Sequence, residues 1–402
     1  MKIVIAHNAY QQSGGEDAVV SAEKTLLLRE GNEVNEYLRH NNEIKAGNIC
    51  SNIALGVRTV WSSSSRSQLY RLLQSGRPDV VHFHNTFPLI SPAAYYACRE
   101  LGVPVVQTLH NYRLFCPAGA FFRDGQVCED CLDKNRWQAV RHACYRQSRS
   151  ASATVAAMLS FHHGYGTWTN LVNCYIALSE FSRAKFIEAG LPPKKIAVKP
   201  NFVVSDPGVG PEQREYAVFL GRLSEEKGIR NLIQAWAKVS RSFTLRVIGD
   251  GPLLNEVRSE ISHSGFTHIR LDGRLLHQES TTALQGARIL ILPSKCYENF
   301  PVCIAEAFAC GTPVIASRLG AMQEIVQDGR TGLHFTPGDA DDLAEKVEWA
   351  WAHSEEMREM GRNARAEFEA KYTAELNYTM LFGIYQQAIS GITQPANEHG
   401  LE

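Results

Sequence analysis

Residues 216–228 read YAVFLGRLSEEKG, and this stretch decides the fold. Its first five residues form a short apolar run of the kind found in buried strands, and the run ends at a glycine turn that leads into a helix. Ligands of doubly wound sheets bind at the carboxyl ends of the strands. Arg222 and Lys227 are therefore placed to neutralise a bound diphosphate. The alternative is that both are surface charges, but cations at a helix start oppose the helix dipole, which favours an anionic ligand.

Short strands alternate with longer helical segments in both directions from this stretch. Downstream, short β-rich runs lie at 244–248, 288–292 and 313–316, and upstream they lie at 2–6, 79–84, 103–108 and 174–178. Such alternation predicts βαβ units and parallel sheets. The expected fold class is therefore α/β, with two doubly wound, Rossmann-like domains.

A break rich in Pro, Gly and Asp at 203–211 separates the two series of strands. We place the first domain at 1–203 and the second at 211–372. Residues from about 111 to 170 carry cysteines, basic residues and aromatics without clear strands, so they are interpreted as an insertion in the first domain. The last amphipathic stretch, 373–392, is expected to cross back to the first domain.

The composition is that of an ordinary globular protein, with 402 residues of which 44% are hydrophobic and 21% charged. A formal net charge of −1 argues against a general nucleic-acid-binding protein, which needs a basic excess. No run of about 18–20 apolar residues and no signal-peptide pattern is present. We therefore expect a cytoplasmic protein.

A second ligand signal is the stretch 292–313, LPSKCYENFPVCIAEAFACGTP, in which Lys295, Glu298 and Glu306 are the only charges. A carboxylate in so apolar a setting costs several kcal/mol, roughly, unless it has a partner, so two of them indicate bound polar ligands rather than a solvated helix face. Pro301 suits the first turn of a helix. Glu298 would then precede that helix, and Glu306 would lie inside it and accept hydrogen bonds from a ribose diol.

The third signal is a glycine turn after the strand at 244–248, formed by Gly249, Asp250 and Gly251. Taken together and in this order, the three stretches resemble the retaining glycosyltransferases of sequence family four, which have the GT-B fold of two Rossmann-like domains facing across a cleft. The resemblance covers nearly the whole chain. It rests on the two glutamates eight residues apart, the Gly-Arg…Glu-Lys-Gly turn that begins at Gly221, and the Gly-Asp-Gly-Pro turn.

The resemblance implies a role for each matching residue in binding a nucleoside diphosphate sugar, the donor. Arg222 and Lys227 bind its diphosphate, Glu306 its ribose, and Glu298 a hydroxyl of the transferred sugar. The backbone at Asn299 and Phe300 also contacts that sugar, and the loop at Arg274 is a candidate for contacts to the base. In the first domain, the resemblance implies that Gly14 and Gly15 let the diphosphate approach a helix start, and that His110 lies near the reacting carbon.

The mechanism implied by the resemblance is attack of an acceptor hydroxyl on the face from which the diphosphate leaves, with a donor phosphate oxygen taking the proton. We expect no catalytic metal, a UDP-sugar as donor with a GDP-sugar as the alternative, and a glycan or lipid-linked glycan as acceptor in surface polysaccharide synthesis. Two alternatives remain open at this stage. One is a nucleotide-sugar epimerase of the same architecture, and the other is a non-catalytic nucleotide-sugar or glycan-binding protein.

Other titratable residues receive a structural interpretation. His7, His82 and His84 are expected to be structural histidines near strand ends. The pair Asp339 and Asp341 resembles a metal-binding motif, but it opens a helix, so we predict a helix cap instead.

Four cysteines and a basic segment lie within the insertion. Cys116, Cys128, Cys131 and Cys144 have a spacing that suits a structural zinc site, with free thiols or an adventitious bridge as the alternative. Between residues 134 and 170 there is no acidic residue, and the basic side chains at 134–149 alternate with Trp137 and Tyr145. This pattern predicts peripheral contact with anionic lipid at the inner face of the cell membrane, and the alternative is a solvated helix.

Overall fold

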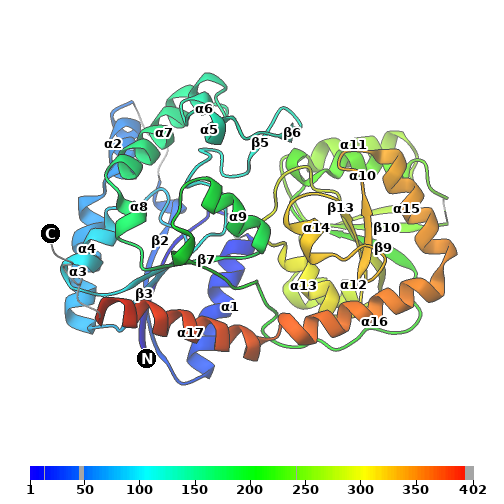
Figure 1. Cartoon of the computed structure of the whole chain (residues 1–402). Helices are drawn as coiled ribbons and strands as arrows, with labels where there is room; N and C mark the ends of the chain where they lie inside the picture. The colour runs from blue at the N-terminus through cyan, green and yellow to red at the C-terminus, as the bar shows by residue number, and fades with distance from the viewer. Residues whose placement is uncertain (13, 45–48, 241, 394–402) are drawn as a thin grey trace, which may run out of the picture. The chain divides into compact units, whose positions relative to one another are not determined.

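A computed structural model describes residues 1–12, 14–44, 49–240 and 242–393 (Figure 1). Contacts between residues divide the chain into two compact units. The first unit consists of Met1–Ala120, Glu129–Lys199 and Tyr378–Glu402, and the second consists of Phe121–Cys128 and Pro200–Asn377. Each unit contains one six-stranded sheet in which every pairing is parallel. The predicted fold class, two doubly wound α/β domains, is confirmed.

The sheet of the first unit has the strand order β2-β1-β3-β4-β7-β8. Its strands are β1 (Lys2–Ala9), β2 (Glu33–His40), β3 (Val80–Phe83), β4 (Val105–Thr108), β7 (Cys174–Ala177) and β8 (Ile196–Val198). The accompanying helices are α1 (Gly15–Arg29), α2 (Ile49–Val60), α3 (Ser63–Gly76), α4 (Ala94–Glu100), α9 (Glu180–Glu188) and α17 (Ala374–Thr393), with short 3-10 turns at Asn41–Glu43 and Pro193–Lys195. The strand order reverses between β1 and β3, where a ligand of such a sheet is expected.

Helices cover both faces of this sheet. On one face, α1 and the red helix α17 of Figure 1 pack against the strands, and Leu381, Ile384 and Tyr385 of α17 lie in the same buried cluster as Ile3 and Ile5. On the other face, the hydroxyl of Tyr95 in α4 donates to Oε1 of Gln107 in β4 at 2.7 Å. The last helix of the chain thus completes the core of the unit in which the chain begins.

The sheet of the second unit has the strand order β11-β10-β9-β12-β13-β14. Its strands are β9 (Tyr216–Leu220), β10 (Thr244–Ile248), β11 (Ile269–Gly273), β12 (Ala287–Leu292), β13 (Val314–Ser317) and β14 (Gly332–Phe335). The helices are α10 (Ile229–Trp236), α11 (Leu254–His263), α12 (His277–Gln285), α13 (Val302–Ala309), α14 (Ala321–Ile325), α15 (Ala340–Ala352) and α16 (Ser354–Lys371), with a 3-10 turn at Glu225–Lys227. In this sheet the strand order reverses between β9 and β12.

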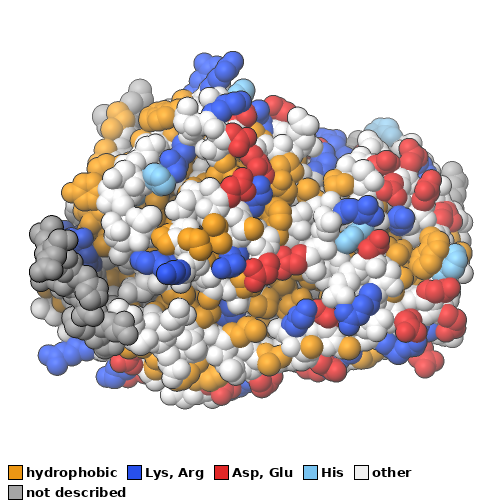
Figure 2. Space-filling view, in the orientation of Figure 1, with side chains coloured by type: hydrophobic (Ala, Val, Ile, Leu, Met, Phe, Trp, Pro, Cys, Tyr) orange, Lys and Arg blue, Asp and Glu red, His pale blue; other side chains and the backbone are white. Residues whose placement is uncertain are grey.

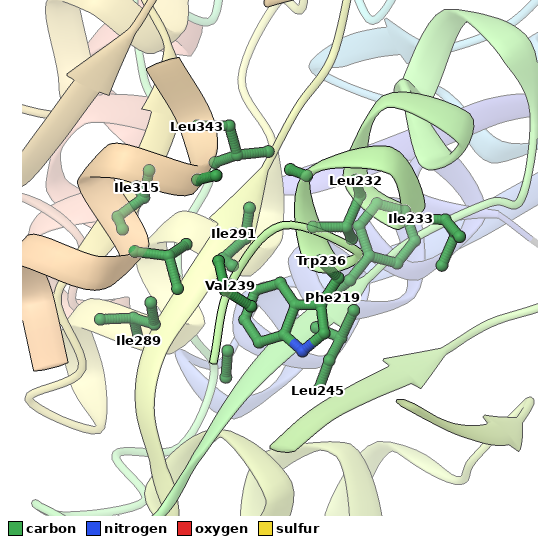
Figure 3. Close-up of a cluster of buried hydrophobic side chains, with 14 of the residues drawn as sticks. Phe219, Leu232, Ile233, Trp236, Val239, Leu245, Ile289, Ile291, Ile315 and Leu343 are labelled. Carbon is green, nitrogen blue, oxygen red and sulfur yellow. The ribbon is translucent and has the colours of Figure 1, made fainter. Parts of the chain in front are cut away.

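Figure 3 shows the core of the second unit, in which helices pack their apolar faces on these strands. Trp236 of α10 is fully buried among Phe219, Leu245 and Ile289, and its ring nitrogen donates to the carbonyl of Phe243 at 3.0 Å. This core fixes the strands, and with them the loops at their carboxyl ends.

The segment between β4 and β7 has more regular structure than the sequence predicted. It contains the hairpin strands β5 (Phe122–Arg123) and β6 (Gln126–Val127), followed by α5 (Asp130–Asp133), α6 (Gln138–Arg141), α7 (Arg149–Gly164) and α8 (Thr167–Asn170). The expectation of no strands was wrong at this hairpin. The helix α7 begins where the Ser148 hydroxyl accepts a hydrogen bond from the Ala151 amide.

A further prediction is settled by local geometry. The carboxylate of Asp339 accepts hydrogen bonds from the amides of Asp341 and Asp342 at 2.9 and 3.1 Å, so the predicted helix cap is confirmed, at the start of α15. Within the described part of the chain, no helix is long and apolar enough to cross a membrane.

Candidate active site

Glycine turns bring the loops after β9, β10 and β12 into close contact in the second unit. A Cβ atom on Gly249, whose φ is 141°, would lie 1.9 Å from the carbonyl oxygen of Gly221. A Cβ atom on Gly228, whose φ is 70°, would lie 1.9 Å from the carbonyl oxygen of Pro293. Only glycine fits such positions. The loops therefore meet at the point where the strand order reverses, which is where a doubly wound sheet binds its ligand.

Lys227 and Glu298 form an ion pair between two of these loops. Nζ of Lys227 lies 2.6 Å from Oε1 of Glu298, and the hydroxyl of Ser294 donates to the same oxygen at 2.7 Å. Burial lowers the pKa of Lys227, but the Glu298 carboxylate raises it more, so the net pKa lies above the ordinary value. The ammonium group stays charged at neutral pH and is held in a fixed position.

Arg222 differs from Lys227 in that its side chain is exposed. Its own loop is fixed, because the amide of Leu223 donates to the carbonyl of Asp250 at 3.0 Å. Among the residues that the structure describes, no carboxylate forms an ion pair with Arg222. A guanidinium on a fixed loop that also carries Lys227 suits an anionic ligand.

Glu306 lies inside α13, which begins after Pro301, as the sequence predicted. Its side chain is 18% exposed, and Nδ1 of His277 lies 3.6 Å from its Oε1. Burial raises the pKa of Glu306, and His277 opposes that shift. The carboxylate is therefore a hydrogen-bond acceptor in a poorly solvated position, as binding of a ribose diol requires.

Three further residues predicted to contact the donor, Asn299, Phe300 and Arg274, also lie in the second unit. Phe300 is buried, and its carbonyl accepts a hydrogen bond from Asn201 at 3.0 Å, so of its backbone groups the amide is the one left to meet a ligand. Asn299, the residue before it, is also buried. Arg274 follows Gly273, whose carbonyl accepts from the amide of Gly249 at 2.8 Å, so the loop at Arg274 borders the glycine turn.

In the first unit, Gly14 and Gly15 form the start of α1. A Cβ atom at either position would meet no other atom within 4 Å. Packing within the protein therefore does not require glycine at these two positions. Close approach of a ligand to the backbone gives a reason for their small size.

His110 follows β4 in the first unit and borders a cavity of about 40 Å³. The cavity is lined by residues of this unit, including His84, Asn111, Arg113 and Trp168. Nε2 of His110 lies 2.9 Å from Nδ1 of His84. Burial lowers the pKa of His110 below its ordinary value, so the ring is neutral at neutral pH.

A buried ion pair in the first unit was not predicted from the sequence. Oε1 of Glu23 lies 2.6 Å from Nζ of Lys199, and both side chains are at most 1% exposed. A signal existed, because Glu23 continues the spacing of the buried residues Val19, Val20, Leu26 and Leu27 on one face of α1. An acidic residue on the apolar face of a helix needs a buried partner.

The four cysteines of the predicted zinc site are not gathered by this structure. Cys116 is buried, whereas Cys128, Cys131 and Cys144 are half-buried. Among the described residues, the structure brings the ligand atoms of Glu23, His82 and His84 within 4.8 Å of one another, but no three of the four cysteines. Zinc binding by the cysteines stays a prediction.

The sequence of the chain matches the models of two known protein families. Residues 206–367 match the family described as glycosyl transferases group 1, and residues 52–206 match glycosyltransferase family 4. Residues 206–367 of this chain belong to the group 1 glycosyltransferases. In this glycosyltransferase, the part that matches group 1 contains Arg222, Lys227, Glu298 and Glu306. The family predicted from those residues is confirmed.

Individual relatives agree with the family. The uncharacterized glycosyltransferase MJ1178 of Methanocaldococcus jannaschii is 33% identical over 161 residues, which is 40% of this glycosyltransferase and 44% of that protein. Glycogen synthase of Mycobacterium tuberculosis is 28% identical over 336 residues, 80% of this chain and 72% of that one. The crystal structure of Anabaena HepE in complex with UDP and glucose shares the fold, with a TM-score of 0.65 and 18% identity over 98% of this chain and 100% of that chain.

Proposed function

We propose that this glycosyltransferase moves a sugar from a nucleoside diphosphate sugar to a hydroxyl group of a glycan or lipid-linked glycan. The observation that carries the proposal is the fixed ion pair of Lys227 and Glu298, with the exposed Arg222 on the same loop as Lys227, at the reversal point of the second sheet. Two cations neutralise a diphosphate and stabilise the charge that develops as it leaves. The carboxylate beside them can accept a hydrogen bond from a hydroxyl of the transferred sugar.

The donor that we propose is a UDP-sugar, and the cations take the part that a catalytic metal has in other transferases. HepE, which shares the fold, was solved with UDP and glucose bound. We also propose retention of configuration at the transferred carbon. In the first unit, Glu23 is paired with Lys199, and Glu16 accepts a hydrogen bond from the Tyr10 hydroxyl at 2.8 Å. These engagements favour attack on the leaving-group face over a carboxylate nucleophile.

The biological setting that we propose is surface polysaccharide synthesis at the inner face of the cell membrane. Glycogen synthase of Mycobacterium tuberculosis, a relative over 80% of this chain, is by its name a polysaccharide-forming enzyme. A growing glycan is therefore a natural acceptor class for this fold with this donor site.

Calorimetric titration with UDP-, GDP- and ADP-sugars tests the donor site. We expect one nucleotide class to bind and Glu306→Ala to weaken its binding about 10- to 150-fold, the loss of a hydrogen bond to a charged group. Because the pKa of Glu306 is raised, its carboxylate takes up a proton at a pH above about 4.3, the ordinary value for glutamate. A protonated carboxyl accepts hydrogen bonds less well, so the affinity of the wild type for the nucleotide sugar should already fall as the pH is lowered towards that value. Glu306→Ala should lack this acid limb.

The matched control for that titration is Glu256→Ala, an exposed glutamate on α11 that is paired with Arg230. Its affinity for the nucleotide sugar should equal that of the wild type. Equal affinity of Glu306→Ala and the wild type would remove Glu306 from the site, and binding of none of the three classes would contradict the proposed donor.

A patch on the first unit supports contact with an anionic membrane. Helices α2 and α7 pack together, and Ile53, Val57 and Phe161 on them are 62%, 63% and 43% exposed. Figure 2 shows hydrophobic side chains in this region of the first unit and a cluster of Lys and Arg side chains above α6. The exposed Arg141 and Arg146 lie at the end of α6 and just after it. Apolar groups bordered by basic ones suit a surface of anionic lipid.

Charge reversal tests this membrane proposal. The double variant Arg141→Glu, Arg146→Glu should bind anionic liposomes at least about 30-fold more weakly than the wild type, since each basic residue near the surface contributes about 1 kcal/mol. The control is Arg358→Glu, Arg362→Glu on α16, which makes the same charge change in the second unit. Equal liposome binding by the two double variants would contradict the assignment of the patch.

A further inference from the structure

Two histidines and a carboxylate form a continuous row in the first unit. Glu23 lies on α1, His84 follows β3, and His110 follows β4. Nδ1 of His84 lies 2.9 Å from Nε2 of His110, and Nε2 of His84 lies 3.5 Å from Oε2 of Glu23. His84 therefore stands between a buried carboxylate and the histidine that borders the cavity.

The carboxylate end of the row is ionised. Oε1 of Glu23 accepts a hydrogen bond from the Lys199 ammonium at 2.6 Å. Burial raises the pKa of Glu23, but Lys199 and His84 lower it, and the net shift is downward. An ionised carboxylate can accept hydrogen bonds but has none to donate. Its second oxygen thus requires a donor from the row.

His84 is the donor that lies nearest to that oxygen. Burial lowers the pKa of His84 well below its ordinary value, so the ring is neutral and carries one proton. Among the described residues, neither Nε2 of His84 nor Oε2 of Glu23 has a hydrogen-bond partner of good geometry. A proton on Nε2 points a donor at the carboxylate, whereas a lone pair there would face the lone pairs of the oxygen in a dry interior. Nδ1 of His84 is then an acceptor.

The hydrogen bonds of Glu23 and His84 determine which ring nitrogen of His110 carries the proton. Because Nδ1 of His84 accepts, Nε2 of His110 must donate. We propose that Glu23 and His84 are positioning residues that hold His110 in the tautomer with its proton on Nε2, so that Nδ1 of His110 presents a hydrogen-bond acceptor to a sugar hydroxyl. This inference deepens the proposed function and rests on it for the part of His110 in sugar transfer.

A metal ion suits these atoms less well than this hydrogen-bonded row. The ligand atoms of Glu23, His82 and His84 lie within 4.8 Å of one another. Both ring nitrogens of His82 are already engaged, at 2.8 Å from the Tyr385 hydroxyl and 2.8 Å from Oγ1 of Thr108. The Lys199 ammonium also supplies the positive charge beside Glu23 that a cation would bring. His82 is thus a structural residue, as predicted, whereas His84 connects Glu23 to His110.

Nuclear magnetic resonance of the full chain labelled with ¹⁵N-histidine tests the tautomer directly. Two-bond ¹H–¹⁵N correlations at neutral pH distinguish the protonated nitrogen of each ring from the other, and the signals of His110 are those lost in His110→Gln. We expect the proton on Nε2 in the wild type and in His84→Asn, whose amide oxygen replaces Nδ1 as acceptor. In His84→Leu, which offers no acceptor, the two tautomers should interchange. A proton on Nδ1 in the wild type, or an unchanged tautomer in His84→Leu, would overturn the proposal.

Turnover of the same variants tests the consequence for catalysis. With the nucleotide sugar that binds in the calorimetric titration, kcat of His84→Leu should fall about 10- to 100-fold, because the accepting group loses its orientation, while donor affinity is unchanged. His84→Asn should recover most of the loss. An equal loss in both variants would show a packing role alone and overturn the proposal. Failure of every nucleotide sugar to bind would contradict the proposed function but leave the tautomer measurement decisive for the row.

Discussion

Replacing Lys227 by alanine is expected to lower kcat/KM for sugar transfer by a factor of about 10²–10³. Its ammonium is held by Glu298 at 2.6 Å before any ligand arrives, so it costs no reorganisation when charge develops on the leaving diphosphate. Removing one such fixed electrostatic group from an active site typically has an effect of about this size. The measurement is steady-state release of nucleotide with the donor identified by calorimetry.

The control for that experiment is Lys238→Ala. Lys238 is an exposed lysine of the same unit that is paired with Asp341 on the surface. A surface pair contributes about 0–1 kcal/mol, so this variant should keep the turnover of the wild type. A second variant, Lys227→Arg, keeps the charge in a different shape and should fall between the two. If Lys227→Ala retained kcat/KM within about threefold of the wild type, the diphosphate would have to be bound elsewhere.

Replacing Lys199 by alanine is expected to lower the free energy of unfolding of the first unit by about 3–5 kcal/mol. The substitution leaves the Glu23 carboxylate in a position that is 1% exposed without its ammonium partner. Hydrogen exchange followed by mass spectrometry measures this unit separately from the second, because exchange of the β1 and β3 amides reports its opening. Protection of β9 and β10, in the second unit, should be unchanged.

A double variant distinguishes the effect of the unpaired charge from the effect of packing around Lys199. Glu23→Leu together with Lys199→Met replaces both charges by apolar groups of similar size, and such replacements are often neutral or stabilising. The double variant should therefore recover most of the protection lost in Lys199→Ala. Continued loss in the double variant would show that packing around Lys199, and not the unpaired charge, determines the stability.

The sequence predicted the two sheets because buried parallel strands are continuous apolar runs, and runs such as 174–178 and 216–220 are distinctive at any position in the chain. It predicts Glu298 and Glu306 as ligand residues for a related reason, since both are charges in an apolar stretch, and that assignment stays a prediction. It did not predict that Lys227 and Glu298 bind each other. They are 71 residues apart, and their contact depends on the order in which the strands assemble.

Glu23 and Lys199 show why other parts of the site were missed. Glu23 had a local signal, since it lies on the apolar face of α1, but nothing near it in the chain identifies its partner Lys199, which is 176 residues away. The hairpin at β5 and β6 was missed because its strands have two residues each, too few for an alternation to be visible. Contacts between segments that lie far apart in the chain are thus not predicted by local sequence pattern.

The helix α17 has a consequence for the synthesis of the protein. The first unit lacks this helix until the ribosome has made the whole second unit, which takes roughly ten to forty seconds at about 5–20 residues per second. During that time, Leu381, Ile384 and Tyr385 do not yet cover their face of the first sheet. The second unit comes later in the chain, but it can fold first because it does not wait for α17. While the chain is being made, the first unit thus exposes an apolar surface. A chaperone that recognises apolar surfaces can bind it during this time.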